Sequence, residues 1–258
     1  MKKLLLAAML ALAAIIPARA ESALDTAIKR GTIIIGISLA NPPFGMTDAN
    51  MQPAGFDVDL SNTIAHDLGV KVQFMDILPG NRVPFLQQGK VDVVVSSFSV
   101  TAERAKVVAF TNPVYMPASA VIAPKSAAIS SVADMAGKSI GVTRTTTGDI
   151  ALTALAPKGT NIQRYEDDAS TAQALFSGQV DAIFTATATF PALMQRNPNL
   201  ALKLTLPSTS PMAIGVRRDD QEMLHWVNTE LGLLWMNGDL QKMQAKWFGV
   251  ANQSMLSY

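Results

Sequence analysis

The most constraining feature of the sequence is a short apolar run, residues 91–95, that ends in hydroxyl side chains and an arginine. A β-branched run of this length is typical of a strand buried on both faces, as in a parallel sheet. Ser97 and Ser99 follow the strand end, which is where open α/β sheets bind ligands. Thr101 is suited to cap a short helix that carries Arg104. We therefore expect an anion-binding pocket formed by hydroxyls, backbone N–H groups and a guanidinium.

A second copy of this pattern occurs later in the chain. Residues 86–94 and residues 175–183 both indicate the end of a helix, a glycine and then a buried strand. The second copy leads into small and hydroxyl-bearing residues at 185–187. Two similar α/β units are therefore predicted, with their strand ends facing one cleft. The alternative is that the serines cap a helix and that Arg104 is a solvent-exposed charge.

The first twenty residues have the features of a secretory signal peptide. Lys2 and Lys3 precede an apolar stretch at 4–16, and Ala-Arg-Ala at 18–20 matches a cleavage site. The apolar stretch is short for a bilayer. Since the chain has no cysteine, it has no disulfide framework and no thiol for a lipid anchor. We expect cleavage after residue 20 and release into the periplasm.

The charge balance of the mature chain gives no sign of a nucleic-acid or membrane surface. Removing the leader takes three of the 21 basic residues and none of the 20 acidic ones, which leaves a formal net charge near −2. The remaining length suits one large domain or two small ones. We expect residues 21–112 and 210–258 to form the first lobe and residues 113–209 the second.

Two further groups of residues are candidates for anion binding. Arg82 is predicted at the amino end of a helix, where its charge opposes the helix dipole; a bound anion is one explanation and a solvent-facing side chain is the other. Thr143, Thr146 and Thr147 follow a predicted strand and lead into a helix. This is a second candidate anion site, although ordinary capping would account for one threonine.

The common signatures of enzymes do not occur. The acidic residues at 166–168 precede a predicted helix, and we interpret them as capping residues, with acid/base catalysis as the alternative. His66 and His225 lie in predicted helices, and the sequence has no metal-ligand spacing, nucleophile elbow, P-loop or dinucleotide fingerprint. We therefore expect no enzyme activity, no cofactor and no metal.

The sequence resembles the bacterial extracellular solute-binding proteins of family 3, the receptors of polar amino-acid ABC transporters. The matching segments are residues 55–60 (GFDVDL), 96–104, 109–111, 137–142 and 246–249. The resemblance implies a type II periplasmic-binding-protein fold: two α/β lobes, with central and mostly parallel sheets, joined by a two-strand hinge that closes on the ligand. It implies an inner-membrane ABC permease as partner, and we expect a monomer that binds no nucleic acid.

The resemblance also implies roles for the candidate residues. Arg104 would pair with the α-carboxylate of the ligand, beside Ser97, Ser99, Thr146 and Thr147. The stretch around Arg82 is similar to that of the glutamate/aspartate receptors, in which an arginine meets a second carboxylate. Thr143 fits the same branch.

Three positions depart from the pattern of the family. The usual aromatic lid residue is Asn41 here, and a second usual aromatic ring is replaced around Pro79. The acidic residue that usually binds the ligand ammonium falls at Ala186. Either Asp168 or Asp149 supplies that charge, or the ligand has no amino group.

The sequence therefore predicts a periplasmic receptor for a small acidic ligand. Glutamate or aspartate is the first choice, and a carboxylate without an amino group is the second. An enzyme of the cyclohexadienyl or arogenate dehydratase kind is the alternative on this fold, with Glu166 or Asp168 as its acid. A receptor for a membrane sensor is a third interpretation.

Overall fold

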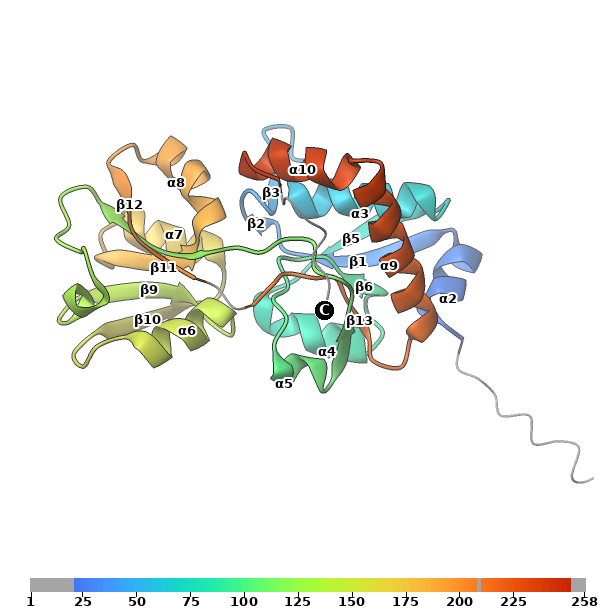
Figure 1. The fold of residues 1–258 in the computed structure, drawn as a ribbon, viewed down its shortest axis with the longest axis horizontal. Coiled ribbons are helices and arrows are strands. Elements are labelled where there is room, and N and C mark those ends of the chain that lie inside the picture. The colour runs from blue at the N-terminus through green and yellow to red at the C-terminus, as the bar shows by residue number, and fades with distance from the viewer. Residues whose placement is uncertain (1–20, 208–209, 252–258) are drawn as a thin grey trace, which may run out of the picture.

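A computed structural model describes residues 21–207 and 210–251 of the chain. Figure 1 shows two groups of helices and strands side by side, joined by two extended segments. We call the group around β1 (Thr32–Ile37) lobe 1 and the group around β9 (Ser139–Thr143) lobe 2. The expected signal peptide, residues 1–20, lies outside the described residues, as do residues 208–209 beside the predicted lobe boundary. The predicted lobe boundaries stay predictions.

Lobe 1 is built on a five-stranded mixed sheet. From edge to edge its strands are β5 (Lys71–Asp76), β1 (Thr32–Ile37), β6 (Val93–Val94), β13 (Gly215–Arg217) and β7 (Val108–Phe110). The first three are parallel, and β13 is antiparallel to both β6 and β7. A small three-stranded sheet of β2 (Ala40–Asn41), β3 (Gly45–Thr47) and β4 (Pro53–Ala54) accompanies it. The apolar run at 91–95 thus forms the central strand, as predicted.

The helices of lobe 1 cover both faces of its sheet (Figure 1). They are α2 (Ala23–Arg30), α3 (Phe56–Asp67), α4 (Arg82–Gln87), α5 (Ala102–Ala105), α9 (Gln221–Met236) and α10 (Asp239–Phe248). One core packs Leu60 of α3 and Val227 of α9 against Ile35, while the other packs Leu86 of α4 against Val94. Alternate residues of a strand point to opposite faces, so a strand that is apolar throughout feeds both cores.

Lobe 2 repeats this plan with a second five-stranded sheet. Its strands, in order, are β10 (Asn161–Tyr165), β9 (Ser139–Thr143), β11 (Ala182–Ala186), β8 (Ser119–Pro124) and β12 (Leu200–Leu206). Its helices are α6 (Thr147–Leu155), α7 (Asp168–Phe176) and α8 (Phe190–Arg196). Leu175 and Leu193 pack on one face of the sheet, and Leu152 packs on the other. The second copy of the sequence pattern therefore supplies β11, again the central strand.

One strand of each sheet runs against the other four. Strands β10, β9 and β11 are parallel, and β8 is antiparallel to β11 and to β12. The reversed strands, β8 and β13, are the first strands after each crossing between the lobes. The chain enters each lobe from the side at which the parallel strands end, and it must therefore run in the opposite direction. The α/β fold with two mostly parallel sheets is confirmed.

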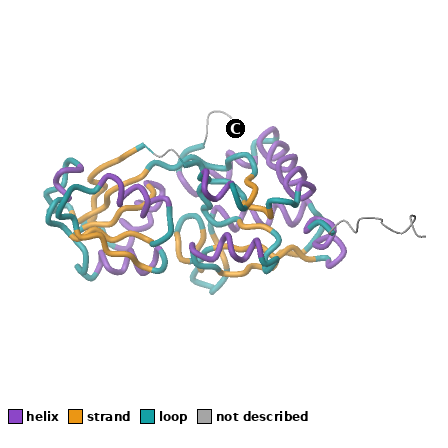
Figure 2. Tube along the Cα trace, turned by 90° about the horizontal axis from the view of Figure 1, so that it is seen from below, coloured by secondary structure: helices purple, strands orange, loops and turns teal. Residues whose placement is uncertain are grey.

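The two crossings lie against each other between the lobes (Figures 1 and 2). The amide nitrogen of Met212 donates to the carbonyl oxygen of Tyr115 at 2.8 Å, and that of Val114 donates to the carbonyl oxygen of Met212 at 2.8 Å. Tyr115 also stacks on Phe248, with ring centroids 4.1 Å apart. These contacts hold together the two segments that connect the lobes.

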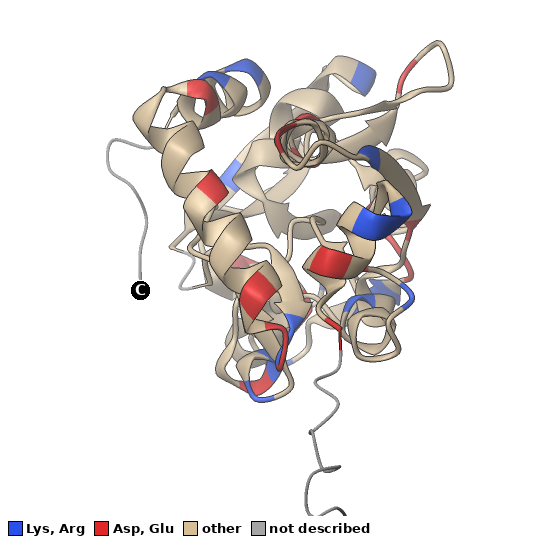
Figure 3. Cartoon of the chain, turned by 90° about the vertical axis from the view of Figure 1, so that its right-hand side faces the viewer, with Lys and Arg blue, Asp and Glu red and all other residues tan. Residues whose placement is uncertain are grey.

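The surface of the described residues carries both signs of charge. Figure 3 shows Lys and Arg beside Asp and Glu on the end of lobe 1, with neither sign alone covering that face. No helix in residues 21–207 and 210–251 is long and apolar enough to cross a membrane.

Candidate ligand-binding site

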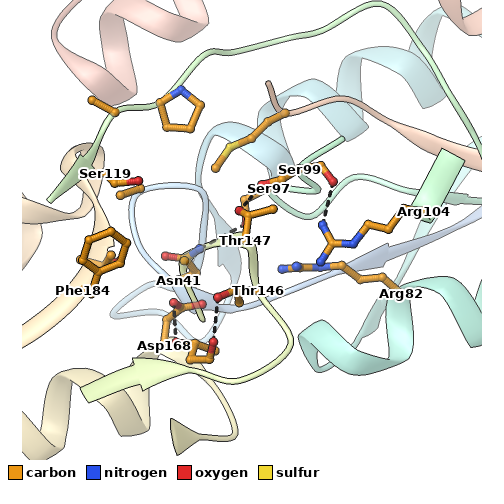
Figure 4. Close-up of a pocket in the computed structure, with 17 residues that line it drawn as sticks. Asn41, Arg82, Ser97, Ser99, Arg104, Ser119, Thr146, Thr147, Asp168 and Phe184 are labelled. Atoms are coloured by element: carbon orange, nitrogen blue, oxygen red, sulfur yellow. Dashed lines mark hydrogen bonds between the residues drawn. The ribbon is translucent and has the colours of Figure 1, made fainter. Parts of the chain in front are cut away.

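A pocket lies between the lobes, and all nine candidate residues line it (Figure 4). Lobe 1 contributes Asn41, Arg82, Ser97, Ser99 and Arg104, and lobe 2 contributes Thr143, Thr146, Thr147 and Asp168. Most of them lie at or just beyond the carboxyl ends of β2, β6 and β9. The strand ends of both sheets therefore face one pocket, as the repeated pattern predicts.

Arg104 is held at this pocket by a short helix and two carbonyl groups. Thr101 caps α5 and accepts a hydrogen bond from the backbone nitrogen of Arg104. Nη1 of the guanidinium donates to the carbonyl oxygen of Ser99 at 2.7 Å, and Nη2 donates to that of Thr145 at 2.9 Å. Burial lowers the pKa of the guanidinium. Thr101 thus caps the helix, as expected, and Arg104 lines the pocket.

Arg82 lies beside Arg104 in the same pocket (Figure 4) and is only 3% exposed. It begins α4, and its Nε donates to Oγ of Ser96 at 3.3 Å. Burial lowers the pKa of Arg82 to about 10; the Arg104 charge adds to this, while Asp168 and Asp57 oppose it. The group therefore stays charged at neutral pH, and the solvent-facing alternative is wrong.

The two guanidiniums share an aromatic neighbour, Phe98. Its ring centroid lies 5.8 Å from Cζ of Arg82 and 5.1 Å from Cζ of Arg104. The ring is buried against Gly215 of β13, where an added Cβ would come within 2.7 Å of it. Among the described residues, neither Arg82 nor Arg104 forms an ion pair within 4.0 Å. The site therefore has two cations that no carboxylate of the described chain pairs.

The backbone conformation of Ser97 directs its amide N–H toward the buried carboxylate of Asp57. Its φ is 40°, in the left-handed region, and its nitrogen donates to Oδ2 of Asp57 at 2.8 Å. Burial raises the pKa of Asp57 to about 7, against the opposing effects of the Ser97 hydrogen bond and Arg82. Sequence reasoning did not include Asp57 in the site, although it belongs to the GFDVDL segment that carries the resemblance.

The threonine turn of lobe 2 divides its hydroxyls between capping and the pocket. Thr146 caps α6: it accepts from the nitrogen of Asp149 at 3.1 Å and donates to the carbonyl oxygen of Thr143 at 2.7 Å. The hydroxyl of Thr147 is instead hydrogen-bonded to that of Ser99 at 3.0 Å. Ordinary capping thus accounts for Thr146 and leaves Thr147 facing lobe 1.

Asp168 is the acidic side chain that lines the pocket. Its Oδ1 accepts from Oγ1 of Thr143 at 2.9 Å. Burial raises the pKa of Asp168, although the Thr143 hydrogen bond and the Arg82 charge lower it. Asp149, the other residue considered for this role, instead pairs with Arg164 at 2.8 Å and does not line the pocket.

Two charged residues that are close in sequence to pocket residues lie outside the pocket themselves. Arg144 and Glu166 form an ion pair at 2.8 Å, and both side chains are exposed. Glu166 is therefore not placed to act on a ligand in the cleft. In the described residues, no group of three or more His, Cys, Asp and Glu side chains is placed to hold a metal ion.

Asn41 has one satisfied and one unsatisfied polar atom. Nδ2 donates to Oγ of Ser97 at 3.2 Å, while Oδ1 is buried and has no hydrogen-bond partner among the described residues. In Figure 4 the amide oxygen points away from Ser97. A buried acceptor without a partner is unfavourable, and because protein atoms cover Oδ1, the group of Asn41 that faces the pocket is not this oxygen.

The structure adds lining residues that sequence reasoning missed. They include Ser119 and Phe184 of lobe 2 and Met212 of the return crossing. Thr185 also lines the pocket, and it belongs to the residues at 185–187 that the repeated pattern predicts at the cleft. Ser119 begins β8 and Phe184 lies near the end of β11, so proximity to a strand end was the available signal.

Comparison with known proteins identifies the family. The model of the bacterial extracellular solute-binding proteins, family 3, matches residues 33–250, and the chain belongs to this family. It is 31% identical to the ABC transporter arginine-binding protein 1 of Escherichia coli over 253 residues, which are 96% of this chain and 99% of that protein.

Two solved structures are similar over most of their length. A mutant of ArgBP from T. maritima has a TM-score of 0.83 and 32% identity, over 88% of this chain and 99% of that one. The ancestral amino acid-binding protein AncCDT-1, described as a precursor of cyclohexadienyl dehydratase, has a TM-score of 0.80 and 33% identity, over 88% of this chain and all of that one.

Proposed function

We propose that this chain is a periplasmic receptor that binds a small acidic amino acid, or a related carboxylate, and delivers it to an inner-membrane ABC permease. The observation that carries the proposal is the pair of guanidiniums in one pocket, the buried Arg82 and the half-buried Arg104, without an ion-pair partner among the described residues. A buried charge is costly unless it is paired, so an anionic ligand stabilises this site.

The charge balance of the pocket favours an anion over the ligands named for similar proteins. Two guanidiniums face a single lining carboxylate, that of Asp168. Arginine, which the similar E. coli protein is named for, would bring a third guanidinium into the same space. A ligand with two carboxylates instead matches Arg82 and Arg104, because a guanidinium binds a carboxylate through parallel hydrogen bonds.

Two classes of acidic ligand fit the pocket, one with an amino group and one without. Asp168 is the lining acceptor that supports an amino acid. Ala186, which also lines the pocket, brings no charge. A carboxylate without an amino group is therefore the second ligand class to be tested.

A thermal-shift screen of refolded, ligand-free protein tests the proposal, because a ligand that binds only the native state raises the melting temperature. The panel is glutamate, aspartate, 2-oxoglutarate, glutamine and arginine. We expect the acids to stabilise the protein and arginine not to do so. Stabilisation by arginine alone would overturn the assignment of an acidic ligand.

A dehydratase is the second candidate function, and Asp168 is the observation that favours it. Its carboxyl has a raised pKa and lies in the same pocket as the guanidiniums of Arg82 and Arg104. An acid of this kind could protonate a leaving hydroxyl. Incubation of the purified protein with prephenate tests this function directly, and we expect no turnover.

A further inference from the structure

Asp57 is a buried carboxyl group that lies behind the binding pocket. It belongs to the first turn of α3, is 3% exposed and is not among the residues that line the pocket. Its Oδ2 accepts a hydrogen bond from the backbone nitrogen of Ser97 at 2.8 Å, across 40 residues of sequence. Ser97 itself lines the pocket. A side chain outside the binding site therefore contacts the backbone of a residue inside it.

The backbone of Ser97 has a conformation that residues with a side chain rarely adopt. Its φ is 40°, and of the three non-glycine residues with a positive φ in the part of the chain that the structure describes, Ser97 is the one that lines the pocket. This region of φ is crowded for a residue with a Cβ, so the conformation persists only where the surroundings compensate for it. The hydrogen bond to Asp57 provides compensation, because a buried amide without an acceptor is unfavourable.

The same conformation sets the direction of the Ser97 hydroxyl. Its Oγ accepts a hydrogen bond from Nδ2 of Asn41 at 3.2 Å, and both residues line the pocket (Figure 4). A change of φ to an ordinary negative value would rotate Cβ of Ser97 relative to the end of β6, and the hydroxyl would leave this position. Asp57 therefore acts on two lining residues, on Ser97 directly and on Asn41 through Ser97.

We propose that Asp57 is a positioning residue of the binding site, which holds the Ser97 hydroxyl toward the carboxylate of the ligand by accepting the Ser97 amide. The proposal rests on the proposed function in one respect, that Ser97 contacts the ligand. The role needs an acceptor oxygen and not a negative charge. Burial raises the pKa of Asp57 to about 7, which is compatible with this role, because a protonated carboxyl still has an oxygen that accepts.

Calorimetric titration of wild type, Asp57→Ala and Asp57→Asn with L-glutamate tests the proposal. We expect Asp57→Ala to bind at least about tenfold more weakly, because nothing then compensates for the conformation of Ser97. Asp57→Asn keeps an acceptor oxygen and should bind within about threefold of wild type. Both substitutions remove the same charge, so the difference between them reports the hydrogen bond. Equal losses in the two variants, or no loss in Asp57→Ala, would overturn the proposal.

A control variant and a second background separate positioning from a general loss of stability. Asp92 is another buried carboxylate of lobe 1; it accepts from the backbone nitrogen of Ile34 at 2.7 Å and precedes β6, at the opposite end of that strand from the pocket. Asp92→Ala should lower the melting temperature and leave the affinity for glutamate unchanged. In a Ser97→Gly background the positive φ carries no strain, so Asp57→Ala should there weaken binding by less than about threefold. An equal loss in both backgrounds would make Asp57 a structural residue only.

Wild-type protein separates a failure of this proposal from a failure of the proposed function. If wild type binds arginine and not glutamate, the acidic ligand is wrong, and the same variants are titrated with arginine, which has the same α-carboxylate. Hydrogen exchange of the Ser97 amide in the ligand-free proteins needs no ligand at all. Exchange should be faster in Asp57→Ala than in Asp57→Asn. Equal exchange in the two variants would overturn the positioning role even if no tested ligand binds.

Discussion

Arg104 of lobe 1 donates from Nη2 to the carbonyl oxygen of Thr145 in lobe 2, at 2.9 Å. The same guanidinium lines the binding pocket, so one side chain both joins the lobes and faces the ligand. Thr147 and Ser99 add a second direct contact between the lobes at 3.0 Å. A carboxylate bound to Arg104 would contact the group that makes this connection, so ligand binding would be coupled to the contact between the lobes.

Replacement of Arg104 should remove binding of every ligand class. Loss of one partner of a buried ion pair destabilises by about 3 to 5 kcal/mol, which puts binding out of the range of an ordinary titration. Calorimetry on Arg104→Ala measures the loss, and Arg144→Ala is the matched control, because Arg144 is exposed and outside the pocket. Unchanged affinity in Arg104→Ala would remove this residue from the site.

Replacement of Arg82 should discriminate between ligands by their number of carboxylates. If Arg82 meets the second acid group, Arg82→Ala weakens the binding of glutamate much more than that of glutamine, which has an amide in the same place. The ratio of the two affinities is the measurement, since it cancels any general effect of emptying a buried site. Equal losses for both ligands would give Arg82 a purely structural role.

Asp57 should make the protein less stable as the pH rises. Its folded-state pKa of about 7 lies above the ordinary value of 3.8, so between these values the folded state binds the additional proton. The free energy of unfolding then falls with rising pH across this interval, by up to about 4 kcal/mol from this group.

The variant Asp57→Asn tests this pH dependence. It keeps an oxygen for the Ser97 amide and removes the titration, so it should gain stability relative to wild type between pH 5 and pH 8. Glu230 also has a pKa raised to about 7, mainly by burial, and the difference between the two proteins isolates Asp57. Parallel stability curves for variant and wild type would contradict the assignment.

Asp168 should matter for a ligand with an amino group and not for a carboxylate that has none. Asp168→Asn removes the lining carboxylate while keeping an oxygen that can accept from Thr143. We expect weaker binding of glutamate, whose ammonium loses its charged partner, and no loss for 2-oxoglutarate. Titration of both ligands against this variant is the check, and a larger loss for 2-oxoglutarate would contradict the predicted role.

Local patterns in the sequence predicted the central strands and the residues at their ends. The apolar segments before Ser97 and before Thr185 predicted two buried strands, and because each strand has a parallel neighbour in its sheet, the ends of both strands lie at one cleft. The pocket-lining positions of Arg82 and Arg104 followed from this reasoning together with the family resemblance. Their function as ligand-binding residues stays a prediction.

Contacts between segments distant in the sequence could not be predicted in this way. Asp149 and Asp168 were both candidates for the acidic residue of the pocket. Only Asp168 lines it, because Arg164 pairs with Asp149 and holds it away from the pocket. The burial of Asn41 beside Ser97 and Asp168 likewise brings together residues that are distant in the sequence. No local pattern of residues encodes such a relationship.

The most direct test of the central claim is the relative affinity of ligand-free protein for glutamate and for glutamine, two ligands of nearly equal size that differ by one negative charge. With two unpaired guanidiniums in the pocket, we predict that glutamate binds at least about tenfold more tightly, the difference that 1.4 kcal/mol of free energy makes. Equal affinities, or tighter binding of glutamine, would contradict an acidic ligand as the function of this cleft.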